Sequence, residues 1–233
     1  MPTSFPTQAA AILSFYKHLK PDFLMKGGVT IMNPYINQDT WATASRFYEK
    51  FYNDKEPRGY IFGINPGRFG AGMTGVPFTD PIRLAEKCGI PNEWNRKAEL
   101  SSIFVYQMID AYGGVEEFYS RFYITAISPL GFVKDGKNLN YYDDKALKKD
   151  IEPFVLRCIR RQLETIPTYS TCYCLGGGTN YNYFIKLNER HGFFKRIIPL
   201  PHPRWVMQYR RKRIAEFADE YVMQLNKLTE EDQ

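Results

Sequence analysis

The stretch GINPGRFGAGMTGVPF, residues 63–78, decides how the rest of this 233-residue chain is interpreted. It follows the apolar residues 60–62, a pattern that predicts a strand ending in a glycine-rich loop. Glycines in such a loop let backbone N–H groups come close to a ligand. A second stretch, PLPHPR at residues 199–204, places His202 in a proline-fixed turn after another apolar run. Together the two stretches predict one site built from two loops.

Apolar runs and helix-capping signals alternate along the chain outside these two loops. Strands are expected over residues 60–62, 122–127, 171–175 and 195–200. Helices are expected over residues 7–19, 39–51, 80–89, 101–112, 143–163, 180–190 and 209–225, with Pro153 breaking or kinking the fifth. This order predicts an α/β fold, with a central, mostly parallel four-stranded sheet flanked by helices on both faces. Ligands bind beyond the carboxyl ends of such strands, which is where both loops fall.

Length and composition predict a single domain over residues 1–233 that does not span a membrane. The chain is 44% apolar, yet it has no run of the ~18 apolar residues that a membrane-spanning helix needs. No basic residue precedes the short apolar run near the N-terminus, which argues against a secretory signal and favours a cytoplasmic location. The four cysteines lack the spacing of a disulfide framework or a metal site, so Cys172 and Cys174 are interpreted as core residues. Neither a metal nor a cofactor is expected.

Positive charge is concentrated around His202. The net charge of the chain is +6, but residues 186–213 contain nine lysine or arginine residues and one acid, Glu189. Such clustering favours a polyanionic partner, because cations that neutralise phosphates release condensed counterions. For the run Arg210, Arg211, Lys212 and Arg213 alone, a solvated helix face is an equally good interpretation.

The loop motif resembles one family closely. Residues 63–79, GINPGRFGAGMTGVPFT, align without gaps with GMNPGPFGMAQTGVPFG, the first motif of the single-strand-selective monofunctional branch of the uracil-DNA glycosylase superfamily. SPLGFVKDGKNL at residues 128–139, LGGG at 175–178 and PHPR at 201–204 resemble further segments of that family. The resemblance covers most of the chain from Tyr60 onward. Residues 1–58, expected to be a helical N-terminal part, carry none.

The resemblance implies a role for each matching residue. Asn65 would hold the hydrolytic water, Phe78 would stack on the extruded base, and His202 would contact the uracil O2 as a catalytic residue. The motif contains no carboxylate to deprotonate the water, which predicts a slow enzyme that depends on stabilising the departing base. The residues expected to surround the base are Gly63, Ile64, Gly67, Phe69, Met73, Phe78, Thr125, Ala126 and Ser128.

The chain departs from the family pattern at the position that reads the base. Ala126 stands where the family has an asparagine, and an alanine side chain cannot hydrogen-bond a base. Either Thr125, Ser128 or main-chain groups take over, or the pocket is less strict and also accepts deaminated purines such as xanthine and hypoxanthine.

A second departure lies in the segment that would contact DNA. The family's serine and proline before the arginine of HPSPR are missing, so either Arg204 or Trp205 is the wedge that fills the gap left by the extruded base. The alternative for Trp205 is packing under the last helix. Arg68 either contacts a phosphate or lies in solvent. Residues 210–213 at a helix start would oppose the helix dipole, which favours a bound anion there.

Three hypotheses follow from the sequence. The first is a monomeric, monofunctional DNA glycosylase of base excision repair that removes uracil and other deaminated bases from DNA. The second is a catalytically weak nucleic-acid-binding protein on the same scaffold. The third, a nucleotide-binding enzyme with residues 63–75 as a phosphate cradle, is weak because the loop lacks the GK[ST] ending and the GxGxxG spacing.

Overall fold

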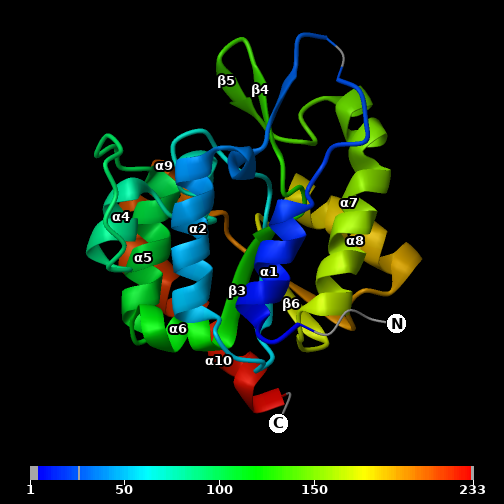
Figure 1. The fold of residues 1–233 in the computed structure, drawn as a ribbon. Helices are drawn as coiled ribbons and strands as arrows, with labels where there is room; N and C mark the ends of the chain where they lie inside the picture. Colours follow the sequence, from blue (N-terminus) through cyan, green and yellow to red (C-terminus); the bar gives the residue numbers. More distant parts are fainter. Residues whose placement is uncertain (1–4, 26, 232–233) are drawn as a thin grey trace.

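The computed structural model describes residues 5–25 and 27–231, and a four-stranded parallel sheet lies at its centre (Figure 1). In spatial order the strands are β3 (Phe122–Ala126), β2 (Gly59–Gly63), β6 (Thr171–Leu175) and β7 (Arg196–Leu200). All three neighbouring pairs are parallel, and the register pairs Gly63 with Ala126 and Leu175 with Leu200. The four carboxyl ends therefore meet at one edge, and the predicted α/β fold with a parallel sheet is confirmed.

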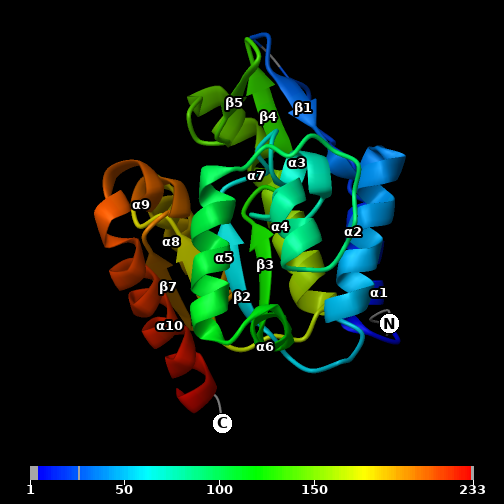
Figure 2. The same ribbon diagram turned by 90° about the vertical axis from the view of Figure 1, so that its left-hand side faces the viewer.

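Helices cover both faces of this sheet. Figure 2 shows α5 (Leu100–Tyr112) and α10 (Ile214–Glu231) in front of it, whereas α7 (Lys145–Thr165) and α8 (Thr179–His191) lie behind. Near the β3 edge lie α1 (Gln8–Lys17) and α2 (Gln38–Phe51). The remaining helical segments are η1 (Pro34–Ile36), α3 (Ala71–Thr74), α4 (Pro81–Glu86), α6 (Val115–Arg121), α9 (Pro203–Tyr209) and η2 (Arg211–Arg213).

A small antiparallel sheet, which the sequence did not predict, stands above the carboxyl ends of the parallel strands (Figure 1). It consists of β1 (Thr30–Met32), β4 (Gly131–Lys134) and β5 (Lys137–Leu139), with β4 in the middle. Asp135 and Gly136 have positive φ angles of 49° and 68°, which form the tight turn between β4 and β5. We call β4 and β5 with this turn the hairpin. It overhangs the glycine-rich loop that follows β2.

Two helices differ from the prediction. The helix α7 continues through Pro153 as one 21-residue element, because its buried face, which includes Ile151 and Val155, packs under the sheet on both sides of the proline. The helix expected over residues 209–225 begins later, as the three-residue η2 followed by α10, and the residues after His202 form α9, a helix that the sequence did not predict. Pro203 occupies a first-turn position of α9, so the proline that predicted a fixed turn instead begins a helix. The cluster 210–213 thus occupies the residue that ends α9 and the η2 segment, which runs directly into α10.

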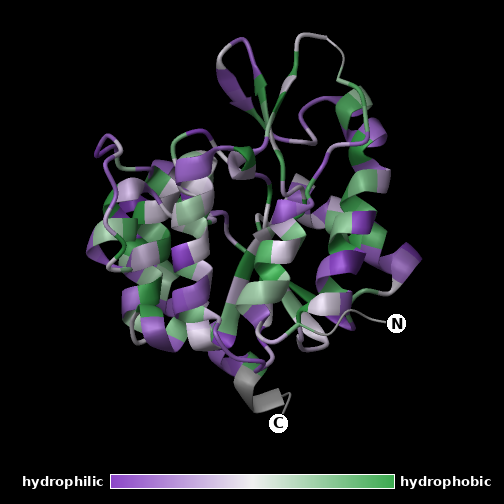
Figure 3. Ribbon diagram, in the orientation of Figure 1, coloured by the Kyte–Doolittle hydropathy of each residue, from purple (hydrophilic) through white to green (hydrophobic). Residues whose placement is uncertain are grey.

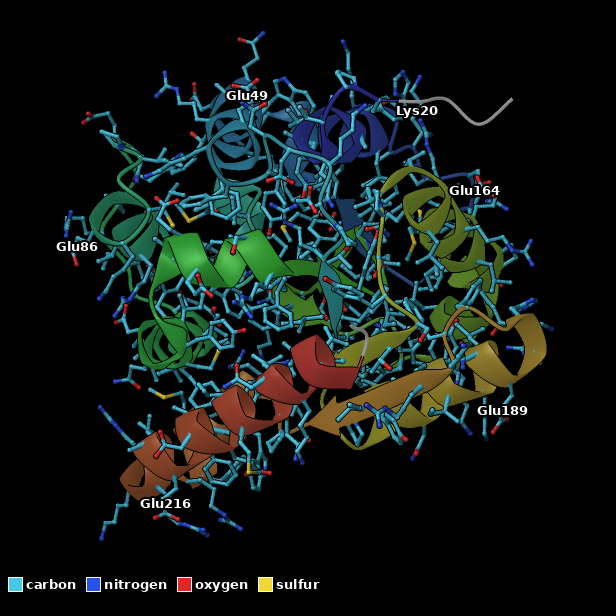
Figure 4. The ribbon with its side chains drawn as sticks, turned by 90° about the horizontal axis from the view of Figure 1, so that it is seen from below. Lys20, Glu49, Glu86, Glu164, Glu189 and Glu216 are labelled. Carbon is cyan, nitrogen blue, oxygen red and sulfur yellow. The ribbon has the colours of Figure 1, made fainter. Side chains whose placement is uncertain are left out.

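The core is rich in aromatic residues. Tyrosine and phenylalanine rings from α1, α2 and the strands pack edge to face, for example Tyr60 against Tyr123 at a centroid distance of 5.1 Å. Hydrophobic residues follow the strands and hydrophilic ones the outward sides of the helices (Figure 3). Seen from below, the labelled charged residues such as Glu49 and Glu189 lie at the periphery (Figure 4). All four cysteines are buried and free, including Cys172 and Cys174 on β6. Within the described ranges, no helix is both long and apolar enough to cross a membrane.

One buried polar side chain ties α7 to the strand that leads to the site. Gln162 is fully buried, and its Oε1 accepts hydrogen bonds from the hydroxyls of Thr125 at 2.8 Å and Tyr123 at 3.3 Å. We expect Gln162→Leu to lower the free energy of unfolding by about 1–3 kcal/mol, because it leaves two buried hydroxyls without that acceptor. Urea unfolding measures the change. The control Gln107→Leu, at an exposed position of α5, should leave stability unchanged, and equal stabilities of the two variants would contradict the expectation.

Candidate active site

A pocket with a volume of about 130 Å³ lies at the carboxyl ends of β2 and β3. It is bounded by the glycine-rich loop on one side, by the start of α9 on another, and by the hairpin and the segment after it. Of the residues predicted from the sequence, its wall contains Gly63, Ile64, Asn65, Gly67, Phe78, Thr125, Ala126, His202 and Arg204. The structure thus brings the two predicted loops together around one cavity.

The amide of Asn65 is held on both sides by the end of β5 and the chain that follows it. Its Oδ1 accepts from the Tyr141 N–H at 3.0 Å, and its Nδ2 donates to the Leu139 carbonyl at 3.2 Å. These two bonds fix the amide plane and leave a second lone pair on Oδ1. The side chain is half-buried in the pocket wall. Asn65 can therefore accept a hydrogen bond from a water molecule in a fixed direction.

Phe78 is placed by strained backbone and by a glycine opposite its ring. Its φ angle of 53° lies in the left-handed region, which is uncommon for a residue with a side chain. The ring packs over Gly63, where a Cβ would lie 2.8 Å from Phe78 Cε2. The centroid of the Phe78 ring is 6.0 Å from that of His202. Gly63 is thus needed for close approach, and Phe78 presents an aromatic surface to the pocket next to the imidazole.

His202 is the N-cap residue of α9, and its ring has a defined hydrogen-bonding state. Its Nδ1 accepts from the Arg204 N–H at 3.1 Å, so the proton of the neutral ring lies on Nε2. Burial, with a smaller contribution from the positive charge of Arg204, lowers the pKa of His202 to about 4. The imidazole is therefore neutral at physiological pH, and Nε2–H can donate a hydrogen bond to a group in the pocket.

The wall formed by the end of β3 offers no polar side chain to a ligand. Ala126 lies in this wall, as predicted. The Thr125 hydroxyl points away to Gln162, and the buried Ser128 hydroxyl donates to the Leu130 carbonyl at 2.9 Å. Ser128 does not belong to the pocket wall. Neither hydroxyl replaces the missing asparagine in this structure.

Two other predicted base-binding residues lie outside the cavity. Met73 is half-buried on α3, where its carbonyl accepts from the Thr40 hydroxyl at 2.8 Å. Phe69 projects from the outer side of the loop and is 38% exposed. Neither belongs to the pocket wall. The α3 turn after Gly70 rotates Met73 away from the cavity, which the linear motif does not reveal.

The predicted DNA-contacting residues surround the pocket at different distances. Arg204 lines the cavity with its side chain exposed, and the Arg68 Nε donates to the Asn138 Oδ1 at 3.2 Å. Trp205 is 38% exposed and contacts the ring of Phe217 edge to face at 5.9 Å. The side chains of Arg210, Arg211, Lys212 and Arg213 are exposed around η2.

The charge argument made for residues 210–213 changes with the structure. Arg210 ends α9, where a cation is favourable to the helix dipole, and Arg213 donates to Glu216 at 2.8 Å in the first turn of α10. The other three cations lie in η2, directly before α10, so a bound anion that offsets them at this helix start stays a prediction. Exposure and net charge remain as reasons to expect an anion nearby.

Sequence reasoning missed several pocket residues. Tyr16 and Tyr35 come from the N-terminal part and stack on each other at a centroid distance of 4.0 Å. Asn138 and Asn140 come from the hairpin and the segment after it. Glu99 brings a carboxylate into the wall, although both of its oxygens accept from backbone N–H groups at the start of α5. The GKNL segment was a usable signal for Asn138, whereas the others depend on tertiary packing.

Comparisons with known proteins decide the family. Residues 49–226 match the model of the uracil DNA glycosylase superfamily. The crystal structure of wild-type SMUG2 from Pedobacter heparinus superposes with a TM-score of 0.93 at 42% sequence identity, covering 97% of this chain and 100% of that one. The chain belongs to the uracil-DNA glycosylase superfamily. A search of curated protein sequences finds no match.

Membership in the uracil-DNA glycosylase superfamily assigns the reaction class. The protein is a DNA glycosylase, and its substrate is DNA. The family identified from residues 63–79 and 199–204 is thereby confirmed. The likeness to SMUG2 covers 97% of the chain and so extends into the N-terminal part, where the sequence showed no resemblance to the family.

The state of His202 gives a pH prediction. Because its pKa is lowered from an ordinary value near 6.5 to about 4 in the folded protein, the unfolded chain takes up the proton first as the pH falls. The stability contributed by neutral His202 is complete above pH 6.5 and is lost progressively between pH 6.5 and about 4. We expect His202→Asn, which retains a capping acceptor, to lose less stability over this range in urea unfolding. Parallel pH profiles of the two proteins would contradict the lowered pKa.

Proposed function

We propose that this glycosylase is monofunctional and hydrolyses the N-glycosidic bond of uracil, xanthine and hypoxanthine in DNA. The observation that carries the proposal is the arrangement of a fixed Asn65 amide, a neutral His202 and the Phe78 ring around one small pocket. Each group matches a need of the reaction. An oriented water must reach the sugar, and the departing base must be held and stabilised.

In the proposed mechanism the base leaves before or as water attacks. The bond between C1′ and the base nitrogen breaks, its electron pair stays on the base, and an oxocarbenium-like sugar remains. The His202 Nε2–H donates to the carbonyl oxygen on which negative charge develops. Water held by the Asn65 Oδ1 bonds to C1′ and releases its proton to solvent, while the base anion takes up a proton after departure. The Phe78 ring supports the extruded base by stacking.

The proposed range of accepted bases rests on the part of the pocket wall that the end of β3 forms. Ala126 has no hydrogen-bonding atom in its side chain, and the hydroxyls of Thr125 and Ser128 are engaged in the protein interior. A base edge in the pocket therefore meets no asparagine amide at that position. Discrimination between a pyrimidine and a deaminated purine needs such a polar partner, because a site rejects an analogue strongly only when its own polar groups are left unpaired. This supports a permissive pocket.

The substrate proposal predicts release of all three bases. Oligonucleotides that contain a single uracil, xanthine or hypoxanthine should each yield an abasic site, and strand cleavage should appear only after alkali treatment. Gel electrophoresis with and without alkali measures both results. Robust excision of uracil with xanthine and hypoxanthine untouched would refute the permissive pocket, and cleavage without alkali would refute a monofunctional enzyme.

The assigned roles predict separable defects. Asn65→Ala and His202→Ala should each slow base release by about 100-fold or more, because each removes an interaction that acts mainly in the transition state. Affinity for a non-cleavable 2′-fluoro-deoxyuridine oligonucleotide should change little. Asn95→Ala and His18→Ala, at exposed positions, are the matched controls. Full activity in both site variants would show that the roles are assigned wrongly.

A further inference from the structure

An exposed aromatic ring stands beside the pocket without any packing role. Phe69 lies between Gly67 and Gly70, which both belong to the pocket wall, but its own side chain lies outside the cavity. It is 38% exposed, and it is not among the residues that pack in or against the hydrophobic core. Exposed large aromatic side chains are favoured where they bind a partner. Core packing therefore does not explain Phe69.

Two cations lie over this ring. The Lys97 Nζ is 3.8 Å from the ring centroid, and the Arg68 Cζ is 5.0 Å from it. Arg68 is anchored, because its backbone N–H and its Nε both donate to the Asn138 Oδ1 on β5. Among the described residues, the Lys97 ammonium contacts the Phe69 ring but has neither a hydrogen-bond acceptor nor an ion-pair partner. Its neighbour Arg96, by contrast, pairs with Glu86.

This combination suits a nucleotide. A nucleobase stacks on an aromatic face, and its phosphates are bound by nearby cations. The Lys97 ammonium has no anchor other than the ring, so it can move from the ring to a phosphate when a base takes its place. Arg68 stays fixed by Asn138 and supplies a second positive charge. Both functions are then provided at one point of the pocket rim.

The position of the ring relative to the pocket identifies which nucleotide it meets. Gly67 and Gly70 border the cavity that would hold the extruded base, so the chain of the substrate must cross this rim to enter and leave it. The nucleotide next to the extruded one is the first to reach Phe69. On the α9 side, Trp205 has a cation of its own, Arg210 at 4.8 Å, but it is also packed against Phe217.

We propose that Phe69, Arg68 and Lys97 form a second nucleotide subsite, in which the ring stacks on the base adjacent to the extruded one and the two cations bind its phosphates. The inference deepens the proposed function and rests on it, because it requires that a base be extruded into the pocket. It gives Phe69 a different role from the one expected from the motif. It also adds Lys97, which lies outside every sequence motif.

The test uses the full-length protein and single-stranded oligonucleotides with 2-aminopurine on the 5′ or the 3′ side of 2′-fluoro-deoxyuridine. Stacking on Phe69 should change the 2-aminopurine fluorescence at one of the two positions, and Phe69→Leu should abolish that change. The affinity of Phe69→Leu should fall by about 5- to 100-fold, the range expected for loss of one stacked base, whereas Phe69→Trp should retain binding. Leu100→Ala, equally exposed at 38%, is the control.

The phosphate contact has its own measurement. Lys97→Ala should reduce the slope of log affinity against log salt concentration by about 0.7, the value for one phosphate of a single strand. Lys20→Ala, at an exposed position outside the pocket wall, should leave the slope unchanged.

Two outcomes would overturn the subsite. The first is a Phe69→Leu variant that binds and alters the 2-aminopurine signal like the wild type. The second is a Phe69→Leu variant that excises bases more slowly but keeps the affinity and the fluorescence change of the wild type. That result would mean that Phe69 only shapes the glycine-rich loop. Failure of the proposed function is recognised separately, because the wild type would then release none of the three bases whatever the binding data show.

Discussion

The site depends on the contact between the glycine-rich loop and the hairpin above it. The loop alone is a run of glycines and prolines with few side chains to hold it in place. The bonds of Asn65 to Leu139 and Tyr141, and of Arg68 to Asn138, fasten it at two points to the hairpin and the chain after it. A hydrolytic asparagine is useful only if its amide direction is fixed, because it orients water and does not ionise. The hairpin provides that direction.

The second loop is stabilised in a different way, by helix capping. His202 accepts from the Arg204 N–H and begins α9 together with Pro203, so the same bond that starts the helix also sets the imidazole tautomer. A neutral histidine gives a hydrogen bond to a developing anion without a charge that would need counterbalance in the ground state. Because the imidazole of His202 is already oriented by the cap, little reorganisation free energy is needed when the base departs. In the proposed mechanism, helix capping uses Nδ1 of this ring and catalysis uses Nε2.

Much of this arrangement could be predicted from the sequence because it follows from local patterns. Apolar runs gave the four strands, and their carboxyl ends located both loops. The hairpin was not predicted, since β4 and β5 are four and three residues long and are stabilised by pairing with each other and with β1. Tyr16 and Glu99 reach the pocket through tertiary packing, which has no local signal. The helix α9 was missed because Pro203 was interpreted as part of a fixed turn, although proline is also favoured at the first position of a helix.

Glu99 is the carboxylate that could be considered as a base for the hydrolytic water. The motif contains no carboxylate, yet one stands in the pocket wall. Its two oxygens accept from the N–H groups of Ser101 and Ser102, so it serves as the cap that begins α5. Both oxygens of Glu99 are therefore engaged by the helix start, which leaves fewer of their lone pairs free to face a water molecule in the pocket. In the proposed mechanism, the rate enhancement therefore depends mainly on stabilising the departing base. The proposal of a broad substrate range and a slow reaction thus rests on His202 as the group that would stabilise the leaving base and on the absence of a polar side chain at Ala126.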